Sequence, residues 1–119
     1  MNWYLSKIVF RILCGNGDHT AQFDEQLRLV AARDEKEAYH KSVELGTKEQ
    51  EVFYNQNQQL VQWQFVNVSE LYRVSELIDG AELYSRITEV DDADSYSKLV
   101  NMKAASIREP YISKTLQLV

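Results

Sequence analysis

Apolar and polar residues alternate along the first third of the chain in two runs, which predicts two β-strands. Within residues 2–13, one face carries four large apolar side chains: Tyr4, Ile8, Phe10 and Ile12. The other face carries three more: Trp3, Leu5 and Val9. A strand that is apolar on both faces is typical of the centre of a sheet. Residues 21–31 alternate again after the turn residues Gly15-Asn16-Gly17-Asp18, so the pattern predicts a β-hairpin.

A helix is predicted over residues 35–45, between a capping signal and a glycine. Asp34 is a favoured N-cap residue, and Glu37 stands at the capping-box spacing from it. Gly46 fits the position just past the helix, which glycine takes readily because it tolerates a left-handed backbone. We expect Ala38, Ser42 and Leu45 on the inner face of this helix.

Residues 51–90 predict up to three further strands. Residues 51–54 form a short candidate, and a polar connector leads to residues 60–68, with Val61, Trp63 and Phe65 on one face. The apolar pattern at residues 71–74 continues this strand or follows a bulge. Asp79-Gly80 is a strong turn signal, and residues 81–90 are a further strand candidate.

The last thirty residues predict a second helix and a tail. The acidic residues 91–94 favour a helix start, and a thin apolar stripe then spans about residues 92–108. Pro110, the only proline, is expected to end this helix. Residues 111–119 form a tail that could be extended.

The predicted order is β-β-α-β-β-β-α, which indicates an α+β fold. We expect an antiparallel sheet of four to five strands with one helix packed on it and a second helix near the C-terminus. We expect one domain over residues 1–119, with a core of about residues 2–90 and a C-terminal helix and tail at 91–119.

Composition excludes several classes of protein. The chain has 119 residues, with 13 Lys and Arg against 18 Asp and Glu, and a net charge of −5. Nucleic-acid binding is disfavoured because phosphate recognition needs concentrated positive charge. No apolar stretch approaches the roughly 20 residues that span a bilayer, and no signal peptide is evident. We therefore expect a cytoplasmic protein with no membrane partner.

Several short motifs together resemble a known family. They are Trp3-Tyr4, Ala32-x-Asp34-x-x-Glu37-Ala38, Leu45-Gly46, Trp63-x-Phe65 and Asp79-Gly80-x-Glu82-x-Tyr84-Ser85. In order and spacing they resemble a family of small bacterial proteins grouped as a domain of unknown function, over about residues 2–88. The resemblance implies a bacterial cytoplasmic origin and an α+β fold, and it implies no activity.

Candidate catalytic and metal-binding residues are sparse. His19 stands beside Asp18, but no second histidine lies at ligand spacing, so a solvated hairpin loop is the favoured interpretation. Cys14, the only cysteine, matches no hydrolase signature. The sequence therefore predicts no catalytic residue, no cofactor and no metal site.

Four aromatic residues are the candidates for a binding surface: Trp3, Trp63, Phe65 and Tyr84. At strand spacing such residues more often belong to a core. The helix at 35–45 can cover only one sheet face. The helix at about 92–108 could cover the other face, and the protein would then be a monomer. Because its apolar stripe is thin, we expect instead a non-catalytic interaction module whose partner is a protein, with a homodimer favoured. The alternative is a small enzyme or small-molecule binder with a pocket beside Trp63 and His19 or Glu82 as its polar group.

Overall fold

The computed structural model describes the backbone of residues 1–117 and the side chains of residues 1–109. Two compact units are present, residues 1–85 and the segment that follows. The first unit contains five elements: β1 (Asn2–Cys14), β2 (Gln22–Ala32), α1 (Glu35–Lys48), β3 (Glu51–Tyr54) and β4 (Leu60–Val74). The second contains α2 (Ala93–Gln117). The expectation of a single domain stays a prediction.

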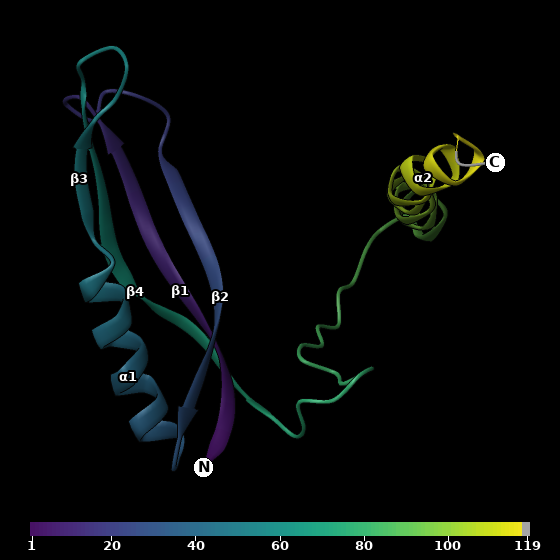
Figure 1. The fold of residues 1–119 in the computed structure, drawn as a ribbon, viewed down its shortest axis with the longest axis horizontal. Helices are drawn as coiled ribbons and strands as arrows, with labels where there is room; N and C mark the ends of the chain where they lie inside the picture. The colour runs from purple at the N-terminus through teal and green to yellow at the C-terminus, as the bar shows by residue number, and fades with distance from the viewer. Residues whose placement is uncertain (118–119) are drawn as a thin grey trace. The chain divides into compact units, whose positions relative to one another are not determined.

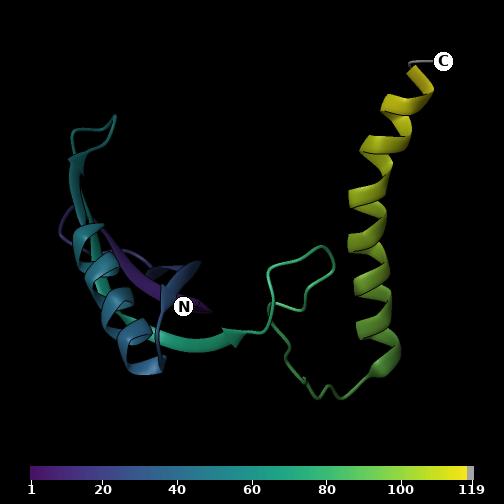
Figure 2. The same ribbon diagram turned by 60° about the horizontal axis from the view of Figure 1, so that its bottom comes forward.

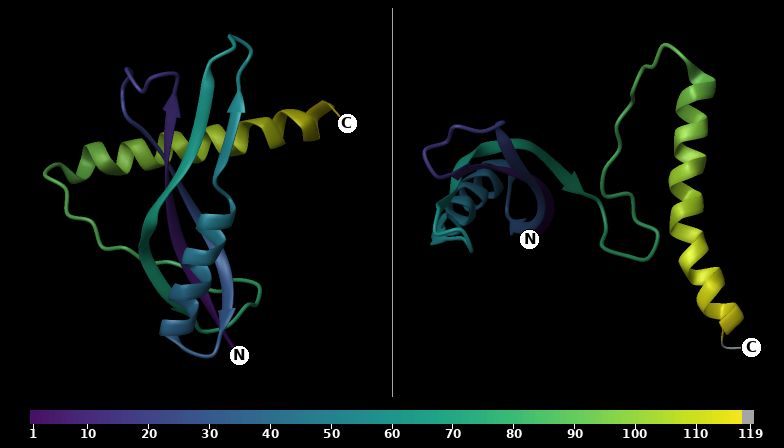
Figure 3. Two further views of the ribbon diagram at one scale, coloured as in Figure 1. Left: turned by 90° about the vertical axis from the view of Figure 1, so that its left-hand side faces the viewer. Right: turned by 90° about the horizontal axis from the view of Figure 1, so that it is seen from above.

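The four strands of the first unit form one antiparallel sheet in the order β2-β1-β4-β3, and α1 packs on one of its faces (Figure 1). The prediction of an α+β fold is confirmed, as is the central position of the first strand. The β1–β2 and β3–β4 turns extend beyond the C-terminal end of α1, so the helix leaves the turn end of the sheet uncovered (Figure 3, left).

The two faces of β1 differ in what covers them. On the side of α1, which we call the covered face, Tyr4, Ser6, Ile8 and Phe10 are at most 2% exposed. The opposite side, which we call the open face, carries Trp3, Leu5, Lys7 and Val9 in alternation with them. The covered face of β1 is therefore apolar because it packs under α1. The open face is also apolar, although α1 does not cover it.

Helix α1 begins as predicted and ends later than predicted. The Glu37 amide donates to Asp34 Oδ1 over 2.8 Å, which confirms Asp34 as the N-cap. The helix continues to Lys48, so the prediction that Gly46 lies past its end is wrong. Gly46 instead joins Ala38 and Ser42 on the buried stripe, because it faces the ring of Phe65 where a larger residue would not fit.

Strand β4 is long because two bulges let it follow β1. Its pairing with β1 shifts register between Lys7 and Ile8 and again between Val9 and Phe10, leaving Ser69 and then Val66 as extra β4 residues. The continuation through residues 71–74 after a bulge is confirmed.

The predicted strand at 81–90 is wrong, because these residues are not in a strand. Tyr84 packs its ring against Tyr72 instead of pairing its backbone.

Helix α2 is one continuous helix (Figure 2). Asp92 caps it by accepting from the Ser95 amide at 3.2 Å and from the Ser95 hydroxyl at 2.8 Å, and these bonds lower the pKa of Asp92.

The predicted end of α2 at Pro110 is wrong, because the helix continues to Gln117. Proline inside a helix removes one backbone donor and crowds the carbonyl four residues earlier, which disfavours a helix without forbidding it. The extended tail at 111–119 is also wrong for residues 111–117, and residues 118–119 lie outside the described residues.

Candidate functional site

The four aromatic residues predicted to form a binding surface lie on two different faces of the sheet. Phe65 and Trp63 are paired with Phe10 and Ile12, so they belong to the covered face. Trp3 is paired with Val74 on the open face. Tyr84 follows β4 and packs against Tyr72, which is paired with Leu5 on that same face. The structure therefore does not gather these residues into one site.

The open face carries an exposed apolar surface, which we call the β2 patch. Its members are exposed by about half: Trp3 43%, Leu29 47%, Leu27 52% and Phe23 54%. The three β2 residues come from the edge strand of the sheet. Alternation along β2 places Phe23, Leu27 and Leu29 on one face. No local pattern in the sequence indicates that this face lacks a cover within the first unit.

A chain of charges crosses the open face beside the β2 patch. Lys7 Nζ lies 3.3 Å from Glu70 Oε2 and 3.8 Å from Glu25 Oε2. The hydrogen bond to Glu70 is the main reason that the pKa of Lys7 is raised. The one lysine of this region is therefore neutralised within its own chain.

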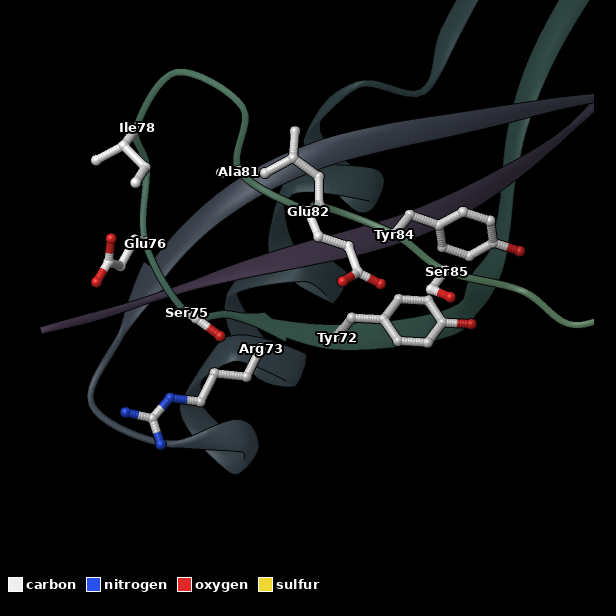
Figure 4. Close-up of a pocket in the computed structure, with 10 residues that line it drawn as sticks. Tyr72, Arg73, Ser75, Glu76, Ile78, Ala81, Glu82, Tyr84 and Ser85 are labelled. Carbon is white, nitrogen blue, oxygen red and sulfur yellow. The ribbon is translucent and has the colours of Figure 1, made fainter.

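A second part of the open face is occupied by the segment that follows β4. The rings of Tyr72 and Tyr84 meet edge to face, with centroids 5.4 Å apart. They border a pocket of about 400 Å³, also lined by Glu82. Figure 4 shows the Arg73 side chain directed away from the two rings, and its guanidinium donates to Asn2 Oδ1 over 3.1 Å.

The covered face has a pocket of its own at the turn end, beyond α1. Its volume is about 510 Å³, and six residues line it: Asp24, Gln26, Glu49, Glu51, Phe53 and Trp63. Neither His19 nor Glu82 is among them, so the structure does not assemble the predicted polar group beside Trp63. Asp24 and Glu51 were missed, because only the strand register brings β2 and β3 to opposite sides of Trp63.

Three contacts hold the walls of this Trp63 pocket. The Trp63 indole N–H donates to Asp24 Oδ2 over 3.3 Å, and the Phe53 ring stacks beside the indole with centroids 6.3 Å apart. The Arg28 guanidinium donates two hydrogen bonds to the Glu49 carboxylate, over 2.6 and 2.8 Å. These bonds are the main reason that the pKa of Glu49 is lowered.

His19 is engaged in holding the β1–β2 turn. Its Nε2 accepts from the Cys14 amide over 2.9 Å, and its Nδ1 lies 2.8 Å from the Thr20 carbonyl. Because a carbonyl only accepts, this arrangement fits the neutral imidazole with its proton on Nδ1. Both ring nitrogens of His19 therefore contact backbone groups of its own turn.

Cys14 is tied to the β3–β4 turn. Its thiol lies 3.4 Å from Gln59 Oε1 and 3.6 Å from Asn55 Nδ2. These two turn residues were not expected near Cys14 from the sequence. In the part of the chain whose side chains are described, no three His, Cys, Asp or Glu residues are grouped so as to hold a metal ion.

No helix among the described residues is both long and apolar enough to cross a membrane.

Comparison with known proteins identifies the family. Neither the curated proteins nor the solved structures contain a match to this chain. Residues 3–85 match the family described as a domain of unknown function, DUF4288, which agrees with the resemblance over about residues 2–88. The matched region spans most of the chain, including α1 and all of the sheet except Asn2, and the chain therefore belongs to the DUF4288 family.

Proposed function

We propose that this protein is a non-catalytic interaction module of the bacterial cytoplasm that binds a second copy of itself through the β2 patch. The observation that carries the proposal is the half-exposed set of large apolar side chains on the edge of the open face. Folded monomers rarely leave extended apolar patches in water, and such patches are typical of interfaces.

A second copy suits the β2 patch for two reasons. Apolar side chains on each copy can cover those of the other across a two-fold axis. Lys7 is already bridged by Glu25 and Glu70, so two copies would not bring unpaired lysines together. A stable interface of this kind would bury at least about 1,000 Å² in total.

The state of His19 supports a non-catalytic role. A general base must have a lone pair within reach of a substrate proton. Both nitrogens of His19 are committed to backbone groups of its own turn.

Light scattering after gel filtration at micromolar concentration tests the proposal. The expected mass for the wild type is twice that of one chain, which is 13.9 kDa. Leu27→Arg places a charge in the β2 patch and is expected to give single chains. Ile87→Arg makes the same kind of change at a residue that is 95% exposed and outside the first unit, and it should leave the dimer intact.

A local readout complements the mass. Trp3 lies in the β2 patch, and Trp63→Phe leaves it as the only tryptophan. Its emission should shift to shorter wavelength as the protein is concentrated, since the interface removes it from water. A wild type that keeps the mass of one chain, or a Leu27→Arg variant that stays dimeric, would refute the proposal.

A further inference from the structure

The Trp63 pocket combines aromatic walls with carboxylates at the uncovered end of the covered face. Trp63 is half-buried, and the Phe53 ring beside it is 42% exposed. The indole is held in place by its bond to Asp24, so an aromatic surface is fixed in orientation beside the pocket. This arrangement lies on the opposite sheet face from the β2 patch.

The charge balance of the pocket is negative. Three carboxylates line it, from Asp24, Glu49 and Glu51. Arg28 neutralises Glu49 with both of its terminal nitrogens. Asp24 Oδ2 accepts from Gln26 over 2.6 Å and from Trp63, and both of these donors are uncharged. Two negative charges therefore remain without a cationic partner among the described residues.

We propose that the Trp63 pocket binds a guanidinium group, as presented by arginine. A planar cation can lie against the indole, which is the strongest cation–π partner among the side chains. Its N–H groups can at the same time donate to Glu51 and to the free oxygen of Asp24. The pocket volume of about 510 Å³ admits an arginine side chain with room for water.

Guanidinium suits the pocket better than other organic cations. A quaternary ammonium group has no N–H to satisfy the two carboxylates. A lysine ammonium is compact and strongly hydrated, so it gains less from a flat aromatic wall than a weakly hydrated guanidinium does. Arg28 shows that a guanidinium forms a two-bonded contact with a carboxylate at the edge of this pocket.

Trp63 fluorescence provides the test. Trp3→Phe leaves Trp63 as the only tryptophan, and the protein is titrated with Nα-acetylarginine amide. The matched ligand is the citrulline amide, which carries an uncharged urea in place of guanidinium. We expect a saturable change of emission with the arginine compound and none with the citrulline compound.

Two variants locate the binding. Glu51→Gln in the Trp3→Phe background removes one free carboxylate and should weaken binding by about fivefold, the effect of an exposed ion pair. Glu44→Gln removes an exposed carboxylate of α1 outside the pocket and should leave the affinity unchanged. Circular dichroism checks that each variant keeps its fold.

A titration with a peptide distinguishes the two sources of the guanidinium, which are a protein partner and a free small molecule. A Gly/Ser peptide with one central arginine is titrated in parallel with the amide. Tighter binding of the peptide assigns the pocket to a protein partner, and equal or weaker binding assigns it to a free small molecule. Either result requires binding that depends on guanidinium.

The proposal is overturned if arginine amide gives no saturable change, if citrulline amide gives the same change, or if Glu44→Gln weakens binding as much as Glu51→Gln. The dimer proposal is judged separately, from the mass of each sample by light scattering. Because the Trp63 pocket and the β2 patch lie on opposite faces, either proposal can fail while the other holds.

Discussion

Gly46 of α1 lies directly against the ring of Phe65 on β4, so that a Cβ at position 46 would overlap Cδ1 and Cε1 of that ring. The same ring meets Phe10 edge to face, with centroids 6.1 Å apart. The Phe65 ring therefore packs between Gly46 of α1 and Phe10 of β1. Its role in packing explains why this residue, which the sequence offered as part of a binding surface, lies under α1.

The Gly46 contact predicts that Gly46→Ala destabilises the protein. Alanine favours a helix over glycine by about 1 kcal/mol, but overpacking of a core typically costs about 1–3 kcal/mol. We expect a net loss in the free energy of unfolding, measured by urea denaturation. In a Phe65→Ala background the ring is absent, and Gly46→Ala should then be neutral or stabilising. Equal losses in both backgrounds would show that the contact is not the cause.

Gly46 also illustrates what the sequence could and could not provide. Glycine after an apolar helical stripe is a common helix end, and the same residue is favoured where a helix approaches a ring closely. Only the partner across the interface separates these two roles, and Phe65 is 19 residues further along the chain. The capping by Asp34, in contrast, depends on neighbours three residues away and was predicted correctly.

The Trp63 pocket and the β2 patch depend on longer-range information. Asp24 and Trp63 meet because they pair with neighbouring residues on the same face of β1: Asp24 with Phe10 on one side, and Trp63 with Ile12 on the other. A shift of one residue in that register would send Asp24 to the open face. Alternation alone predicts that Leu27 and Leu29 share a face, but not that β2 is an edge strand without a cover in its unit.

Ser6 predicts an unusual stabilising substitution. Its side chain is fully buried on the covered face, and its hydroxyl has no hydrogen-bond partner among the described residues. Removing an unsatisfied buried hydroxyl relieves a desolvation penalty of about 1–3 kcal/mol, so Ser6→Ala should raise the free energy of unfolding.

Ser42 provides the matched control for Ser6. It is equally buried, but its hydroxyl donates to the Ala38 carbonyl over 2.7 Å. Ser42→Ala loses that bond and should not share the gain seen for Ser6→Ala. If both substitutions stabilise the protein alike in urea denaturation, the difference in hydrogen bonding is irrelevant.

The Arg28–Glu49 pair predicts a dependence of stability on pH. The pKa of Glu49 is lowered from 4.5 by its bonds to Arg28, so the pair stabilises the fold above that value. The contribution is lost as the pH falls through the lowered pKa of the folded state. Because both side chains are about one third exposed, we expect about 0.5–1 kcal/mol at pH 7.

Urea denaturation of the wild type and Arg28→Met from pH 7 down to pH 3 measures this contribution, with the difference shrinking below pH 4.5. Arg33→Met removes the partner of Glu37 at a side chain that is 81% exposed, and it serves as the control with little effect. A difference between wild type and Arg28→Met that stays constant with pH would contradict the assignment.

The N-cap of α1 supplies the last prediction. Asp34 has an extended backbone and accepts from the Glu37 amide, which satisfies a donor that the helix leaves free. Asp34→Ala should therefore cost about 1 kcal/mol in the free energy of unfolding, whereas Asp34→Asn keeps an acceptor and should cost less.

The Glu37 side chain separates this cap from a reciprocal capping box. Its carboxylate accepts from Arg33 Nε over 2.6 Å, and no described bond returns it to the Asp34 amide. Glu37→Gln should consequently have much less effect than Asp34→Ala, because it leaves the amide that Asp34 binds. Thermal unfolding of the three variants at pH 7 gives the ranking. An Asp34→Ala variant that melts with the wild type would show that the observed bond adds nothing to stability.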